Sequence, residues 1–229
     1  GFERAAVLTV DGVGEWATAS WGVGSGNNLE IKGEIRFPHS LGLLYSAFTW
    51  YCGFKINSAE YKLMGLAPYG QPRFVEAIRE LIHIAEDGSF HLDMRHFSYD
   101  KGQRMFNKRF EEVLGRERRT LESPDMEEHY KDVARSIQEI TNEAMVKMAQ
   151  NVMDKTGETR LCLSGGVALN CVANGHILRE TSVEELFIQP AAGDAGSAMG
   201  AAYVLWNQLL DKPRQPALPT PYLGPGYNA

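Results

Sequence analysis

The first part of the chain consists of short apolar runs separated by glycine-containing turns. Residues 5–10 are continuously apolar or β-branched and lead into Asp11 and Gly12, which predicts a central strand that ends in a tight turn. Residues 16–23 alternate more loosely, and residues 29–37 alternate apolar with charged side chains, as in a half-exposed strand. Short turns join the three runs, so we expect an antiparallel meander.

Helical spacing of apolar residues begins after residue 38. A helix is predicted from Ser40, whose hydroxyl suits an N-cap, to just before Gly53. Residues 73–85 predict a second helix. Residues 123–157 carry apolar side chains three and four positions apart, a Ser-Pro start and a closing glycine, and these features predict one long amphipathic helix.

The apolar pattern is weak over residues 89–122. Residues 90–97 are compatible with a strand and residues 107–114 with a short helix. We therefore interpret this part of the chain as an insertion of uncertain shape, with bounds at about residues 68 and 125.

The last third repeats strand, glycine-containing turn and helix. Strands are predicted at residues 161–164 and 185–189, and helices at residues 167–179 and 195–210. The complete order predicts an α/β fold with a mixed sheet and helices on both faces. This order matches one lobe of the ribonuclease H-like architecture shared by actin, heat-shock chaperone ATPases and sugar kinases.

Domain limits follow from the distribution of proline. Residues 1–212 are predicted to form the lobe, and the proline-rich residues 213–229 lack apolar periodicity and are typical of a linker. Both ends are typical of a piece of a longer polypeptide, because the chain lacks a starting Met and begins almost at once with a strand.

Composition and charge bear on which binding partners are expected, in particular nucleic acid and membrane. The 229 residues are 44% hydrophobic and 23% charged, with a formal net charge of −6, which disfavours a nucleic-acid-binding surface. No run of 18 apolar residues is present, so no membrane span is expected. Three cysteines without a Cys-x-x-Cys motif are typical of reduced residues in a cytoplasmic protein.

Two carboxylates follow predicted strands. Asp11 and Gly12 end the first strand, where a carboxylate could approach a metal or phosphates and Gly12 could contact a bound nucleotide, although Asp-Gly is also a common hairpin turn. Asp194 follows Gly193 at a strand-to-helix turn, where Asp is often only an N-cap. Both should project from the same edge of the sheet.

A glycine pair ends another strand at that edge. Gly165 and Gly166 precede a helix, and Asn170 lies one turn inside it, which suits close approach of a ligand backbone or anion. A tight turn chosen for packing is the alternative. Lys62 could hold a phosphate as a point charge, although a single lysine is usually solvated. Two acidic groups beside an anion-binding turn favour a cation between them.

Four motifs together resemble a known family, the O-carbamoyltransferases of nodulation and antibiotic tailoring. They are FPHSLGLLY at residues 37–45, YKLMGLAPYG at 61–70, LSGGVALN at 163–170 and GDAGSAMGAA at 193–202. The resemblance runs from about residue 5 to residue 223. It implies an N-terminal domain similar to the tRNA threonylcarbamoyl-adenosine transferase, followed by an adenylate-forming domain.

The resemblance also implies an activity and a set of ligands. Carbamoyl phosphate and ATP would yield carbamoyl-adenylate, and the carbamoyl group would pass to a hydroxyl of a sugar or other small-molecule acceptor. An iron-like divalent metal would be held by Asp11 and Asp194 as catalytic residues, together with a histidine pair upstream of this chain. Gly165, Gly166, Val167 and Asn170 would bind the adenosine side.

Two other functions remain open on the sequence. The chain could belong to an ATP-dependent small-molecule kinase of the same architecture, or be a nucleotide-binding lobe without catalysis. Under each hypothesis, half of the ligand shell would lie outside these residues. We therefore expect the isolated chain to be inactive, to bind nucleotide weakly and to self-associate through an uncovered face.

Overall fold

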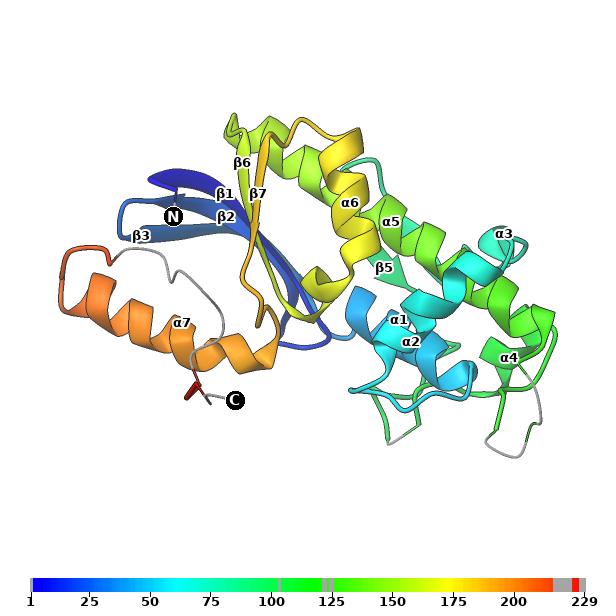
Figure 1. The fold of residues 1–229 in the computed structure, drawn as a ribbon. Coiled ribbons are helices and arrows are strands. Elements are labelled where there is room, and N and C mark those ends of the chain that lie inside the picture. Colours follow the sequence, from blue (N-terminus) through cyan, green and yellow to red (C-terminus); the bar gives the residue numbers. More distant parts are fainter. Residues whose placement is uncertain (1, 103, 121–122, 124–125, 216–223, 227–229) are drawn as a thin grey trace.

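The computed structural model describes residues 2–102, 104–120, 123, 126–215 and 224–226. Its centre is a five-stranded mixed sheet in the order β3-β2-β1-β6-β7 (Figure 1). The strands are β1 Arg4–Val10, β2 Ala17–Ser25, β3 Asn28–Arg36, β6 Arg160–Ser164 and β7 Glu185–Ile188. β1 is antiparallel to β2 and parallel to β6, and β6 is parallel to β7. The predicted mixed α/β fold, with its meander and parallel crossovers, is confirmed.

Seven α-helices are described. They are α1 Leu41–Tyr51, α2 Glu60–Leu66, α3 Val75–Ile78, α4 Lys108–Leu114, α5 Glu128–Thr156, α6 Cys171–Glu180 and α7 Ser197–Tyr203. Three short 3₁₀ helices cover Ala67–Tyr69, Gly166–Leu169 and Asp194–Gly196, and a π-helix, Val204–Leu209, continues α7. Figure 1 shows α5 and α7 on opposite sides of the sheet.

The hydrophobic core lies on the α5 side of the sheet. Ala6, Leu8 and Val10 alternate inward from β1 and are fully buried, because successive strand side chains point to opposite faces. Long helix α5 covers them with the apolar positions that predicted it, and it ends at Gly157 in the left-handed conformation. Ser40 caps α1 as expected, since its Oγ accepts from Leu43 N–H at 3.0 Å.

The helix predicted over residues 73–85 is wrong. Only Val75–Ile78 is helical, and β4 (Ile82–Ile84) pairs with β5 (Phe90–Leu92) as an antiparallel hairpin. The apparent helix stop at residues 86–88 is the hairpin turn, in which Gly88 has φ +77.

The boundaries of two other elements differ by several residues from the predicted ones. The long helix begins at Glu128 rather than at Ser123, and Pro124 and Asp125 lie outside the described residues. The strand expected over residues 90–97 ends at Leu92. The insertion is part of the main core, since its aromatic residues Phe97, Phe106 and Phe110 are buried there.

The limits of the lobe and the linker remain predictions. Residues 216–223 and 227–229 lie outside the described part. Of the preceding residues, Arg214 pairs with Glu3 at 3.0 Å and donates to the carbonyl of Phe2. The start of the proline-rich segment therefore lies beside the first strand.

Candidate functional site

Asp11 lies just beyond β1 and connects two turns of the chain. Its Oδ1 accepts hydrogen bonds from the backbone N–H of Gly12 at 2.7 Å and of Gly166 at 3.1 Å. Hydrogen bonds to an ionised acceptor are among the stronger ones in proteins. Asp11 therefore does more than form a hairpin turn, because it holds the end of β1 against the turn that follows β6.

Gly165 occupies a position that only glycine fits. Its φ of +94 lies in the region that favours glycine, and a Cβ there would come within 2.2 Å of the Val10 carbonyl oxygen. The packing interpretation therefore holds for Gly165. At Gly166 a Cβ would lie 3.0 Å from Asp11 Oδ1, so the absence of a side chain lets the backbone approach the carboxylate.

The loop after β7 brings Asp194 to the same edge of the sheet. The Ala192 carbonyl accepts from Gly165 N–H at 2.9 Å and from the Ser164 hydroxyl at 3.2 Å. The 3₁₀ helix that starts at Asp194 has Gly193 as its N-cap, without a side-chain capping bond. Asp194 is exposed, and its carboxylate accepts no hydrogen bond within the described part of the chain. The N-cap alternative is therefore not supported.

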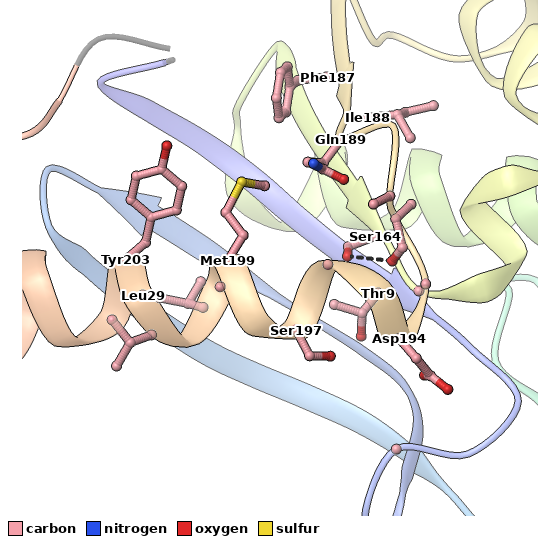
Figure 2. Close-up of a pocket in the computed structure, with 18 of the residues that line it drawn as sticks. Thr9, Leu29, Ser164, Phe187, Ile188, Gln189, Asp194, Ser197, Met199 and Tyr203 are labelled. Atoms are coloured by element: carbon pink, nitrogen blue, oxygen red, sulfur yellow. Dashed lines mark hydrogen bonds between the residues drawn. The ribbon is translucent and has the colours of Figure 1, made fainter. Parts of the chain in front are cut away.

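Two cavities meet at Asp11. The larger, which we call the α7 cavity, has a volume of about 1010 Å³ and lies between the sheet and α7. Asp11, Gly165 and Asp194 line it. Figure 2 shows Asp194 at the start of the helix, with its carboxylate directed away from Met199 and Tyr203. The predicted metal ligands thus border one cavity.

The smaller cavity, which we call the α2 cavity, has a volume of about 370 Å³ and lies beside α1 and α2. The predicted nucleotide-binding residues that line it are Gly12, Gly166, Val167 and Asn170. Four of the five residues assigned to the nucleotide turns are thus brought together here, while Gly165 lines the α7 cavity instead.

An amide network behind the α2 cavity was missed by sequence reasoning. Asn170 Oδ1 caps α6 by accepting from Ala173 N–H at 3.0 Å, and its Nδ2 donates to Gln138 Oε1 at 3.1 Å. The same Gln138 oxygen accepts from the Tyr45 hydroxyl at 2.9 Å. Burial raises the pKa of Tyr45 above its ordinary value, which keeps this hydroxyl a donor. The network fixes the Asn170 side chain at the cavity wall.

A second carboxylate in the α2 cavity was also missed. Glu60, the first residue of α2, accepts from the Ser46 hydroxyl at 2.9 Å and from Asn57 N–H at 2.8 Å. It lines the same cavity as Asn170. The local sequence offers no signal for it beyond a carboxylate at a helix start, which is common for helices in general.

Lys62 lines neither cavity, although its neighbour Tyr61 lines the α2 cavity. Its side chain is exposed, and its Nζ lies 6.0 Å from the centroid of the Tyr61 ring. The structure therefore does not bring Lys62 together with the other predicted ligand-binding residues.

Metal-ligating side chains are sparse in the described part of the chain. No group of three or more His, Cys, Asp or Glu side chains lies close enough together there to hold a metal ion. Asp11 and Asp194 would supply two oxygen ligands, which suits a hard or borderline cation but leaves its coordination incomplete. Among the described helices, none is long and apolar enough to cross a membrane.

The fold and the site define an α/β domain in which glycine-containing turns and two carboxylates gather at the carboxyl edge of a mixed sheet. Comparison with known proteins specifies the class, because residues 1–203 match the family described as "Carbamoyltransferase N-terminus". The chain belongs to this family. The resemblance identified from the four motifs is thereby confirmed.

Individual relatives agree with this assignment. An uncharacterized protein of Synechocystis is 52% identical over 99% of this chain, which spans 37% of that relative. The nodulation protein NolNO of Sinorhizobium fredii and the nodulation protein NolO of Bradyrhizobium diazoefficiens are each 36% identical over 98% of this chain, which spans 31% and 39% of their lengths. The crystal structure of HypF from T. kodakarensis covers 89% of this chain at 14% identity, with a TM-score of 0.37. The chain therefore spans between 31% and 39% of the length of these curated relatives.

Proposed function

We propose that this chain supplies one half of a site that transfers a carbamoyl group to a hydroxyl of a sugar or other small molecule. Carbamoyl phosphate, ATP and water would first give carbamoyl-adenylate, inorganic phosphate and pyrophosphate. The hydroxyl oxygen of the acceptor then attacks the carbamoyl carbon and loses its proton to water, the bond from that carbon to the adenylate oxygen breaks, and AMP leaves. Membership of the carbamoyltransferase family supports the reaction class.

The observation that carries the proposal is the position of Asp11. Its carboxylate is shared by the turns at Gly12 and Gly166, and it borders both cavities. A nucleotide in the α2 cavity and a reacting group near Asp194 would therefore meet at this carboxylate. Holding two reactants at one point lowers the entropic part of the barrier.

The nucleotide would contact the backbone of Gly12 and Gly166, where no side chain intervenes. Val167 would provide an apolar wall and Asn170 an amide already oriented by Gln138. The N–H groups of both glycines already donate to Asp11, so these turns offer the nucleotide close approach to the backbone rather than free donors.

Asp11 and Asp194 are proposed to bind the iron-like divalent cation, with further ligands from outside these residues. When bound, the cation would act as a Lewis acid toward the carbamoyl carbonyl. The unpartnered carboxylate of Asp194 supports this role, since it makes no capping bond and lines the same cavity as Asp11.

The architecture is proposed to be one lobe of the ribonuclease H-like fold of actin and the sugar kinases. The strand order β3-β2-β1-β6-β7, with β2 antiparallel to β1, supports that assignment. In this arrangement, residues after 212 would lead to the adenylate-forming domain. A cytoplasmic location is proposed from the free cysteines Cys52, Cys162 and Cys171.

The test uses a chimera in which this chain replaces the matching part of the Synechocystis relative. The chimera is incubated with ATP, labelled carbamoyl phosphate and a panel of hydroxyl compounds. We expect carbamoylated acceptor and AMP, and we expect Asp11→Asn and Asp194→Asn to abolish the product. Asp154→Asn, an exposed aspartate on α5, is the matched control.

The alternatives give different products in the same assay. ADP and a phosphorylated acceptor, formed without carbamoyl phosphate, would identify a small-molecule kinase. Nucleotide binding without turnover of any acceptor would favour a non-catalytic lobe. Full carbamoyl transfer by the Asp194→Asn chimera would disprove the assignment of that residue.

A further inference from the structure

Helix α7 and its π-helical continuation are apolar yet lie largely in solvent. Six of the large hydrophobic side chains in residues 203–210 expose more than a third of their surface: Tyr203, Val204, Leu205, Trp206, Leu209 and Leu210. A helix that is hydrophobic all round is normally buried on all sides. Part of its packing surface is therefore uncovered here.

The sheet opposite α7 is uncovered as well. Leu29 of β3 and Phe187 of β7 line the α7 cavity and are 50% and 46% exposed. Figure 2 shows Leu29, Phe187 and the helix residues Met199 and Tyr203 around the same space. The helix and the sheet thus present two apolar surfaces that face the cavity and are not packed against each other.

The helix also has a second apolar face, directed away from the cavity. Met199, Tyr203 and Val204 line the cavity, whereas Ala201, Leu205 and Leu209 do not and are exposed. Those three recur at a spacing of four, so they form one stripe along the helix. A small ligand could fill the cavity but would leave this outward stripe in water. Only a polypeptide surface would cover both.

We propose that the α7 cavity and the outward stripe bind an apolar surface of another domain of the same, longer polypeptide. The relatives support a covalently linked partner, because this chain spans only 31–39% of the nodulation proteins and 37% of the Synechocystis protein. A linked domain is present at a high effective concentration, which favours it over a second copy. Since Asp11 and Asp194 line the same cavity, the bound domain would also border the candidate site.

The experiment compares hydrogen exchange in the isolated chain and in the chimera with the Synechocystis relative, both at low concentration. We expect the backbone amides of residues 197–209 to exchange about tenfold or more slowly in the chimera, because packing suppresses local opening. The amides of α5 serve as an internal reference for folding, and their exchange should be similar in the two proteins.

Variants of the outward stripe test whether the slower amide exchange in the chimera depends on these side chains. Leu205→Glu with Leu209→Glu should remove the protection of residues 197–209 in the chimera. Leu178→Glu, at a similarly exposed leucine on α6, should leave it unchanged. Because α5 reports folding separately, loss of protection in α5 too would mark a misfolded variant, and Leu205→Gln with Leu209→Gln would then replace it.

Three results would overturn the proposal. Equal exchange of residues 197–209 in the two proteins would show that no linked domain covers the helix. Protection in the chimera that disappears on dilution, together with dimers in sedimentation, would assign the surface to a second copy. Protection that requires added ATP or carbamoyl phosphate would assign the cavity to a small ligand.

Discussion

The carboxylate of Asp11 and the backbone N–H of Gly166 form a hydrogen bond of 3.1 Å between residues 155 positions apart in the chain. This contact joins the end of β1 to the turn after β6, on neighbouring parallel strands. It gives Asp11 a structural role that is independent of any ligand. A stability measurement on Asp11 variants therefore reports this structural role, and an activity measurement on the same variants reports the proposed role toward a ligand.

Asp11→Ala should lower the free energy of unfolding by about 1–3 kcal/mol, because it leaves the N–H groups of Gly12 and Gly166 without their acceptor. Asp11→Asn should cost less, since an amide oxygen can accept the same two bonds. Urea denaturation followed by circular dichroism measures both. Equal stability of wild type and Asp11→Ala would show that this contact is not formed in solution.

Gly165→Ala should prevent folding or lower the free energy of unfolding by about 3 kcal/mol or more, since it combines a positive φ with a clash against the Val10 carbonyl. Gly65→Ala is the matched control. Gly65 lies within α2 with open space around its Cα, so alanine there should be neutral or stabilising by up to about 1 kcal/mol. The soluble yield and the urea midpoint of unfolding are measured for the two variants and compared with those of the wild type.

Sequence patterns were sufficient for the parts of the fold that local periodicity encodes. The continuous apolar run of β1 and the three- and four-residue spacing in α5 each correspond to a buried element. The carboxyl edge of the sheet was predictable for the same reason, because Asp11 and Asp194 each follow a recognisable strand.

Contacts between distant residues left no such pattern. The network of Tyr45, Gln138 and Asn170 joins α1, α5 and the turn before α6, and an isolated amide within a helix carries no local signal of its partner. β4 lies within the range predicted as a helix, residues 73–85, but it forms a strand because the pairing of Ile82 with Leu92 outweighs local helix propensity. The role of Lys62 as a phosphate-binding residue stays a prediction, since its place near a motif in the sequence does not determine the direction of its side chain.

Acidification should destabilise the protein through His39. Burial, and then the nearby His91, lower the pKa of His39 in the folded state, so the unfolded chain binds the proton more readily. The free energy of unfolding should therefore fall as the pH decreases through about 6.5, the ordinary pKa of histidine. Thermal unfolding between pH 8 and pH 5, at constant ionic strength, measures the slope.

His39→Asn is the comparison variant for this effect. His39 Nδ1 accepts from Leu92 N–H at 3.1 Å, and an Asn oxygen can accept at a similar position without titrating. The decline of stability near pH 6 should become shallower in the variant. An unchanged slope would assign the effect to other groups, of which His129 also has a lowered pKa because of burial.

The isolated chain should self-associate at high concentration through the apolar surface of α7. Leu205 and Leu209 are 51% and 73% exposed, and contiguous exposed apolar surface favours association. Sedimentation velocity over a hundredfold range of concentration should reveal species larger than the monomer. Leu205→Glu with Leu209→Glu should restore the monomer, whereas a wild-type chain that stays monomeric throughout would contradict the prediction.

The isolated chain should bind ATP only weakly, with a dissociation constant above the micromolar range, since it supplies the walls of the α2 cavity but only part of the proposed ligand shell. Calorimetry with ATP and a divalent cation measures the affinity. Gly166→Val should abolish the residual binding, because its side chain would fill the space between the turn and Asp11. Lys62→Ala should change the affinity little, as Lys62 lines neither cavity. Submicromolar binding by the isolated chain, or a large loss in Lys62→Ala, would show that the nucleotide lies elsewhere.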